Sequence, residues 1–377
     1  MITDSLLSDL ILLASRSPSA HNTQPWSPRI VGDTVEVSVV PSRTLPAGDS
    51  TFRDVVLALG AWVESFAIGA ADRGYAIDLE VLPMISDLDE LPITGPADPD
   101  SPVLRIAVHP AVESAPTGPA GTGGPVPFTP EDVRQRAVYR GALAGDPGLF
   151  ADLTDSELPS WLSLREIDPA VIGHLSRLGI AYTASRKDVG EELLHWLRLS
   201  QRHPHHDLDG LTAEALLMPG WAARIAAPFT RRARLRNPAL AVGVVVGRAV
   251  ESYHRTKPLP RNGRSVVGNA AAGRHFVLVA NARNAGLTHL LGAAEALTSQ
   301  IGMPEPLVVD AGRALQRLWL QASREGAAVS PHSELIDSPA AHAALRKRLG
   351  LGRADVALAV FSAGRPLGAV PRSARLL

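Results

Sequence analysis

The pattern of apolar and polar positions predicts a chain that mixes helices with strands. Three segments repeat apolar side chains every three or four residues, the spacing of one buried helix face: residues 5–15, 51–73 and 311–325. Other apolar runs are typical of strands: residues 29–40 (two strands), 77–82, 103–108, 275–280 and 356–361. Because the order lacks a regular strand–helix–strand repeat, we predict the α+β fold class.

A segment rich in proline, glycine and alanine divides the chain. Residues 114–127 show no apolar periodicity, and the Pro-Glu pair that follows is a helix start signal. We therefore expect a first half over residues 1–113, a linker over 114–129 and a second half over 130–377.

The second half is harder to interpret. Helices are expected over residues 169–178 and 188–202. Residues 203–260 are polar, rich in arginine and interrupted by glycine and proline, so we predict irregular structure with short helices there, and a lid or insert over about 203–262. The run VGVVVG at 242–247 lacks a phosphate-loop motif and is expected to be a buried strand.

Two pairs of segments suggest an internal duplication. Each pair joins a long helix that ends at glycine to a later strand: residues 51–74 with 77–82, and residues 311–326 with 356–361. Sequence identity between the pairs is low, so the hypothesis rests on the pattern alone.

Composition narrows the class of protein. The 377 residues carry a net charge of -1 and no cysteine, which excludes disulfides, thiolate metal sites and cysteine nucleophiles. Asp4 and Asp9 stand where a signal peptide would be basic, and no apolar run has the length of a membrane span. We therefore expect a cytoplasmic protein with no membrane or nucleic-acid partner.

Two clusters of histidines or arginines could suggest a metal site or a nucleic-acid site, but both are better interpreted as ordinary protein surface. The run HPHHD at residues 203–207 lacks the spacing of a metal site, and a surface loop is the preferred interpretation. A group of arginines lacks interleaved aromatic residues, so a solvated or interdomain face is preferred to a nucleic-acid site: Arg224, Arg231, Arg232, Arg234 and Arg236. We predict no metal.

The most distinctive segment is SPSAHNTQPW, residues 17–26, which we call the polar loop. It is dense in hydrogen-bonding side chains, and Pro18 and Pro25 stiffen it by fixing their own φ angles. A rigid polar loop after an apolar helix is a good wall for a planar ligand. The sequence therefore indicates a ligand site here.

The polar loop also resembles a hallmark of the flavin-dependent nitroreductase superfamily, and most closely its actinobacterial Acg-like branch. Further segments resemble that branch in chain order: residues 41–49 (PSRTLPAGD), 60–61 (GA), 135–140 (QRAVYR), 312–320 (GRALQRLWL), 364–366 (GRP) and 371–372 (PR). The resemblance extends over nearly the whole chain.

The resemblance implies a nitroreductase-like fold in which two tandem halves form an intramolecular pseudo-dimer with one FMN site under a lid. It also implies an FMN-dependent oxidoreductase. Electrons pass in a ping-pong cycle from NAD(P)H through flavin N5 to a small organic acceptor, and no side chain is an obligatory acid or base. The expected state is a monomer or a weak homodimer.

The resemblance assigns cofactor-binding roles residue by residue. Ser19, Asn22 and Gln24 are expected at the isoalloxazine edge, Ser17 beside them, and His21 at the phosphate or ribityl chain. Arginine suits the phosphate. The remaining expected flavin contacts are Arg136 and Arg140 on one helix face, Arg372 and Arg375 in the C-terminal tail, and Pro331, His332 and Ser333 near N5.

Several positions depart from the family pattern. Gln135 replaces the first arginine of a doublet, Val138 replaces a threonine, and Ser373 displaces the last arginine to Arg375. Residues 292–309 look like an insertion before the late helix. Two alternatives therefore stay open: an FMN-sequestering or storage protein without turnover, and a biosynthetic flavin-dependent dehydrogenase or oxidase of a small metabolite or peptide.

Overall fold

A computed structural model gives the fold and describes residues 2–84, 98, 100–111, 128–150, 158–231, 233–255, 273–287 and 303–376. The helices are α1 (Asp4–Ala14), α2 (Arg53–Asp72), α3 (Pro130–Gln135), α4 (Pro169–Ser185), α5 (Lys187–His195), α6 (Gly220–Arg231), α7 (Ala233–Arg255), α9 (Glu305–Arg324), α10 (Glu334–Asp337) and α11 (Pro339–Leu349), with 3-10 turns η1 (Ala20–Asn22) and η2 (Pro41–Arg43). The strands are β1 (Trp26–Val31), β2 (Thr34–Val39), β3 (Tyr75–Val81), β4 (Pro102–Pro110), β5 (Leu143–Ala144), β6 (Leu162–Ile167), β7 (Leu197–Arg198), β8 (Leu211–Thr212), β9 (Arg274–Asn281), β10 (Ala328–Pro331) and β11 (Asp355–Pro366).

Two antiparallel sheets share one topology. The first has the order β1-β2-β4-β3, and the second has β6-β9-β11-β10, with β5 added to the end of β11. Numbered along the chain, both are 1-2-4-3. In both sheets a 20-residue helix, α2 or α9, separates the second strand from the third. This common plan confirms the α+β class and the two tandem halves.

The topology also refines the suggested duplication. The helix pair is correct, because α2 and α9 occupy equivalent places. The strand that follows α2, β3, corresponds to β10, whereas residues 356–361 lie in β11 and correspond to β4. The short β10 was missed because four residues give too little periodicity to recognise.

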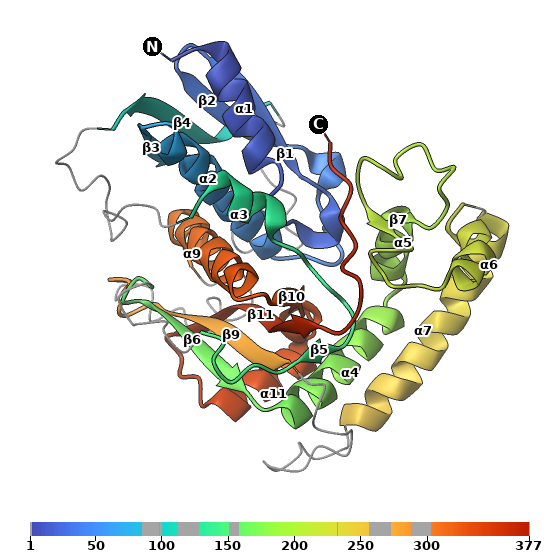
Figure 1. Ribbon diagram of the computed structural model, residues 1–377. Coiled ribbons are helices and arrows are strands. Elements are labelled where there is room, and N and C mark those ends of the chain that lie inside the picture. Colours follow the sequence, from blue (N-terminus) through green and yellow to red (C-terminus); the bar gives the residue numbers. More distant parts are fainter. Residues whose placement is uncertain are drawn as a thin grey trace.

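Helices α2 and α9 lie between the two sheets, and α4 and α11 cover the outer face of the second sheet (Figure 1). Strand β9 shows why its sequence is continuously apolar. Phe276 and Leu278 point to the central core, while Val277 and Val279 pack against α4 and α11. A strand buried on both faces needs no polar alternation.

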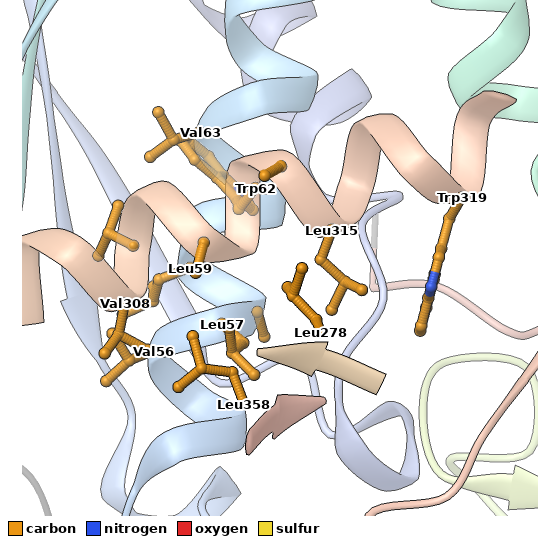
Figure 2. Packing of buried hydrophobic residues seen from close by; sticks show 14 of the residues in the cluster. Val56, Leu57, Leu59, Trp62, Val63, Leu278, Val308, Leu315, Trp319 and Leu358 are labelled. Atoms are coloured by element: carbon orange, nitrogen blue, oxygen red, sulfur yellow. The ribbon is translucent and has the colours of Figure 1, made fainter. Parts of the chain in front are cut away.

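The first sheet is buried on one face only. In β2 the buried residues Val35, Val37 and Val39 alternate with partly exposed ones. This period of two produces the alternation in the sequence. Trp62, Leu59 and Val63 of α2 then join Leu315 and Val308 of α9 in the central core (Figure 2).

Helices α2 and α9 meet backbone to backbone. A Cβ atom on Gly60 would lie 2.1 Å from the carbonyl oxygen of Val309 and 2.8 Å from the Cα of Gly312. A Cβ atom on Gly312 would lie 2.3 Å from the carbonyl oxygen of Leu57. Only glycine at both positions allows this approach.

A buried ion pair sits beside this crossing. Both carboxylate oxygens of Glu64 accept hydrogen bonds, from Arg317 Nε at 2.6 Å and from Arg313 Nε at 3.0 Å. Burial alone would raise the pKa of Glu64, but Arg317 and Arg313 hold it below its ordinary value. These two contacts link α9 to α2 and so fix the rotation of one helix against the other. Breaking them would be costly, because the buried carboxylate of Glu64 would lose its partners.

Most expected elements of the described chain are confirmed with shifted ends. The first helix is capped by Thr3, whose Oγ1 accepts a hydrogen bond from the amide of Leu6. The expected helix over 188–202 ends at His195, and the late helix begins at Glu305 rather than residue 311. Strand β6 and helix α11 were not predicted.

The largest correction concerns residues 203–260. Residues 203–219 are irregular apart from the two-residue strand β8, and α6 is a short helix, as expected. The 23-residue helix α7, which includes residues 242–247, is the part that differs from the prediction. The run VGVVVG is neither a strand nor buried, since Val242, Val245 and Val246 are exposed. Its many valines favoured a strand, but contact with α4 allows the helix.

Two expectations fall largely outside the described residues. The linker over 114–129 is described only at Phe128 and Thr129, and Thr129 forms a capping box with Asp132 at the start of α3. The expected insertion over 292–309 is described from Met303 onward. Residues 305–309 belong to α9, and Val308 and Val309 are core residues, so that end is not an insertion.

We expect Gly60→Ala to lower the free energy of unfolding by about 3 kcal/mol or more, because the new methyl group meets backbone atoms that cannot move without separating the helices. Gly173→Ala in α4 is the matched control, since its nearest neighbour is an arginine nitrogen at 3.8 Å. The control should change stability by less than about 1 kcal/mol, in the stabilising direction. Urea unfolding of both variants tests this, and equal stabilities would contradict the glycine contact.

Candidate functional site

A cavity of about 910 Å³ lies where the two halves meet. The polar loop, the first half of α2, residues 134–140, residues 330–337 and the C-terminal tail all contribute to its wall. Ten of the twelve expected cofactor residues line it: Ser19, His21, Asn22, Arg136, Arg140, Pro331, His332, Ser333, Arg372 and Arg375. Cofactor and ligand sites typically occupy about 300–1,000 Å³, and this cavity is near the upper end.

The polar loop adopts an unusual backbone. His21, Asn22 and Gln24 have φ angles of 48°, 56° and 51°, in the left-handed region that disfavours residues with side chains. The amide of Gln24 donates a 2.9 Å hydrogen bond to Ser19 Oγ, which holds the reversal. Such local strain persists only where surrounding contacts enforce it, and it is concentrated at functional sites.

Two predicted cofactor residues point away from the cavity. Ser17 Oγ is buried against the carbonyl of Ala61 at 3.0 Å and Ser65 Oγ at 2.9 Å. Gln24 donates from Nε2 to the carbonyl of Leu208 at 2.9 Å and accepts at Oε1 from the amide of Leu376. These side chains hold the loop in place and do not line the cavity.

Asn22 is positioned at the cavity wall, but its amide is already engaged. Nδ2 donates to the carbonyl of Ala374 at 2.9 Å, and Oδ1 accepts from Arg375 Nη1 at 2.6 Å. Asn22 therefore ties the C-terminal tail to the polar loop, rather than offering both amide atoms to a planar ligand as expected.

Three arginines converge on one side of the cavity. The carbonyl oxygen of Arg16 accepts hydrogen bonds from Arg136 Nη2 at 3.0 Å and from Arg375 Nη2 at 3.1 Å. We call Arg16, Arg136 and Arg375 the arginine cluster. Across the described chain, none of these three guanidinium groups forms an ion pair with a carboxylate within 4.0 Å.

The arginine cluster concentrates positive charge that no carboxylate of the described residues neutralises in an ion pair. Burial, then Arg375 and Arg16, lower the pKa of Arg136 to about 9. Burial and Arg16 lower the pKa of Arg375 to about 10. Arg136 Nε and Nη1, Arg375 Nε and Arg16 Nε are buried donors with no hydrogen-bond partner in the described residues. Unpaired buried donors are costly, so these groups suit an anion.

The expected helical pairing of Arg136 with Arg140 is wrong. Helix α3 ends at Gln135, and Arg136 already has an extended ψ of 130°. Both side chains nevertheless reach the cavity, with Arg140 Nη1 donating to the carbonyl of Ala215 at 3.4 Å. Arg372 also lines the cavity and is exposed.

His21 adds a neutral ring to this wall. Burial, then Arg140, lower the pKa of His21 to about 4. The ring is therefore uncharged near neutral pH. Its Nδ1 atom is buried and has no hydrogen-bond partner within the described chain.

Residues 331–333 begin a polar chain that leads away from the cavity. His332 Nε2 lies 2.7 Å from Ser362 Oγ, which in turn lies 2.6 Å from His275 Nδ1. On its other side, His332 Nδ1 is 3.3 Å from Glu334 Oε1. This chain fixes the His332 ring in the wall. Ser362 is buried and does not line the cavity, so it is not placed as a nucleophile.

Sequence reasoning missed an acidic group in the same cavity, formed by Asp49, Asp54 and Asp337 around Arg53. Arg53 Nη2 donates to Asp54 Oδ1 and to Asp337 Oδ1, each at 2.9 Å. Burial raises the pKa of Asp337 to about 7, with Arg53 opposing and Asp54 adding to the shift. The segment containing Asp49 was noted, but Asp337 joins it only through the fold.

Residues 189–212 close one side of the cavity. Val189, Leu193 and Leu211 contribute apolar lining. Glu192 accepts hydrogen bonds from the amides of Ala47 and Gly48 at 3.0 and 2.8 Å.

An ion-pair cluster ties the same segment to the polar loop. Asp209 pairs with Arg43 and Arg198, both at 2.8 Å, and Arg43 also donates to the carbonyl of Thr23. His205 Nδ1 lies 3.1 Å from Asp209. No group of three or more histidine, aspartate or glutamate side chains placed to hold a metal occurs in the described residues.

Parts of the chain are similar in sequence to known proteins. No family model matches the chain. It is 32% identical over 87 residues to "Putative NAD(P)H nitroreductase acg" of Mycobacterium tuberculosis, a match covering 23% of this chain and 26% of that protein. Another M. tuberculosis protein named as an NAD(P)H nitroreductase is 29% identical over 100 residues, covering 26% and 29%.

These relatives confirm the resemblance to the Acg-like nitroreductases. The chain spans little more than a quarter of the length of the relatives it matches. A solved structure described as a "putative nitroreductase" from Anabaena variabilis aligns with 88% of this chain and 69% of its own, at 13% identity and a TM-score of 0.31. That overlay is too loose to bear on the fold.

The partly buried His275 predicts a pH dependence of stability. Burial, then His332, lower the pKa of His275 to about 4, whereas an unfolded histidine titrates near 6.5. The unfolded chain therefore binds the proton more readily between these values, and stability is lost as the pH falls. In His275→Gln, the loss of unfolding free energy between pH 6.5 and 4 should be smaller than in the wild type by about 2–3 kcal/mol.

Urea titrations at several pH values measure this difference. The exposed His195→Gln is the matched control and should follow the wild type. If wild type and His275→Gln lost stability in parallel as the pH fell, His275 would not have the lowered pKa described here.

Proposed function

We propose that the protein is an FMN-dependent oxidoreductase of the nitroreductase type. NAD(P)H and a small organic acceptor are its substrates, and the two halves act as a single-chain pseudo-dimer. When bound, FMN would accept electrons from NAD(P)H and release them to the acceptor in a ping-pong cycle. The relatives named as NAD(P)H nitroreductases support the reaction class.

The observation that carries the proposal is the arginine cluster. It presents unpaired buried donors in a cavity large enough for a cofactor, and the cost of its uncompensated charge disappears when an anion binds. A phosphate group with several acceptor oxygens matches this donor set, because planar guanidinium groups bind phosphate in a bidentate manner. We assign Arg136 and Arg375 to the FMN phosphate, with Arg16, Arg140 and Arg372 around it.

The rest of the wall suits a flat, partly polar ring. Ser19 and His21 supply polar atoms, and Trp319 and Leu315 supply apolar surface. We assign His21 to the ribityl chain or the ring edge, and Pro331, His332 and Ser333 to the face near N5. Ser17, Asn22 and Gln24 position the loop and the tail, so their effect on the cofactor is indirect.

A storage function is the second candidate, and the closed side of the cavity favours it. Glu192 and Asp209 anchor residues 189–212 to the residues that follow the polar loop. A lid held this firmly would slow the entry of NAD(P)H and the loss of FMN alike. The protein would then bind FMN without turnover.

An absorption spectrum of the purified protein, followed by anaerobic addition of NADPH and then NADH, separates these functions. We expect yellow protein that bleaches on addition of either nucleotide. Yellow protein that stays oxidised would contradict the reductase and favour either the storage function or a dehydrogenase that is reduced by another substrate. Colourless protein that also leaves added FMN unbound would contradict both.

A further inference from the structure

Helices α6 and α7 present a row of exposed apolar side chains. On α6, Trp221, Ile225 and Phe229 are spaced four residues apart and therefore share one face. Trp221 is 64% exposed and Ile225 62%. Exposed apolar side chains that share one helix face are a common feature of interaction sites.

Helix α7 has one packed face and one exposed face. Gly247 contacts α4, since a Cβ there would lie 2.6 Å from the amide nitrogen of Ser185. Away from this contact, Val242, Val246 and Tyr253 follow helical spacing and are exposed, as is Val245 at 69%. Figure 1 shows α6 and α7 along one edge of the molecule, with α4 on the inner side of α7.

The same two helices are strongly basic. Residues 220–255 contain seven arginines, one glutamate and no lysine or aspartate, although the whole chain has a net charge of -1. Arg224, Arg234 and Arg248 are exposed among the apolar side chains. We call the exposed apolar and basic side chains of α6 and α7 the amphipathic surface.

We propose that the amphipathic surface docks the protein onto anionic phospholipid membranes. Helices that lie in a membrane interface combine tryptophan and aliphatic side chains on one face with arginine or lysine beside it. Tryptophan and tyrosine prefer the headgroup region, and arginines are attracted to anionic lipids. Trp221, Tyr253 and the arginines supply these components.

Charge distinguishes this partner from a second copy of the chain. A symmetric dimer would bring the same arginine-rich surface against itself, so like charges would face one another. Nucleic acid would neutralise the arginines but leave the aliphatic face in water. An anionic bilayer surface satisfies both the charged and the apolar side chains.

The association is peripheral. Among the described helices, only α2 is long and apolar enough to cross a membrane, and 89% of its apolar window is buried inside the protein. The proposal revises the expectation of no membrane partner, which rested on the absence of a spanning segment. It does not depend on the proposed reaction.

Sedimentation with large unilamellar vesicles tests the proposal. We expect the full-length protein to pellet with vesicles of equal phosphatidylglycerol and phosphatidylcholine, and to stay in solution with phosphatidylcholine alone. Binding should weaken as NaCl rises, since surface charges are screened. The double variant Trp221→Ser/Ile225→Ser should bind at least about tenfold more weakly.

Matched controls remove the same residue types elsewhere. Leu12→Ser on α1 removes an exposed apolar side chain, and Arg353→Glu reverses an exposed charge. Both should bind as the wild type does, and thermal unfolding confirms that each variant is folded. Absence of binding to anionic vesicles would overturn the proposal. So would equal loss in the controls, or analytical ultracentrifugation showing a dimer that Trp221→Ser/Ile225→Ser dissociates.

Discussion

The contact between Gly60 and Gly312 is the constraint on which the rest of the structure depends. It brings α2 and α9 together with no side chain between their backbones, and so fixes the distance between the two halves. Glu64 then pairs with Arg313 and Arg317 across the crossing, which fixes the rotation of the helices. A polar chain continues the contact outward, from Gln316 through Ser65 to Ser17 at the start of the polar loop. The loop that forms one wall of the cavity is therefore anchored to the helix crossing.

The cavity combines groups that are far apart in sequence. Arg16 follows the first helix, Arg136 follows α3, and Arg375 belongs to the C-terminal tail. Their convergence costs electrostatic free energy that an anion would recover. Elsewhere in the cavity wall, Arg53 is paired with Asp54 and Asp337, so its positive charge is compensated. The positive charge without an ion-pair partner therefore belongs to the arginine cluster.

Local patterns predicted the elements whose burial follows a simple period. Strands β2 and β9 were found because one alternates and the other is apolar throughout, and α2 was found because its apolar positions repeat as in a helix. The polar loop was recognised by its composition.

Helix α7 was missed because valine runs favour strands, and its helix depends on packing against α4. No local signal marked Arg16 or Asp337, because only the fold brings them to the cavity. The roles of Asn22 and Gln24 were not visible either, since their partners are distant in sequence: both contact the C-terminal tail, and Gln24 also contacts Leu208.

Binding of a flavin phosphate by the arginine cluster can be measured by titrating flavin-free protein with FMN and with riboflavin, which lacks only the phosphate. We expect FMN to bind the wild type at least about tenfold more tightly than riboflavin, since each charged hydrogen bond contributes roughly 1.5–3 kcal/mol. Arg136→Ala should remove most of that preference and leave riboflavin affinity unchanged, while Arg353→Ala should alter neither. Equal affinity of the wild type for FMN and riboflavin would show that the arginine cluster does not bind the phosphate.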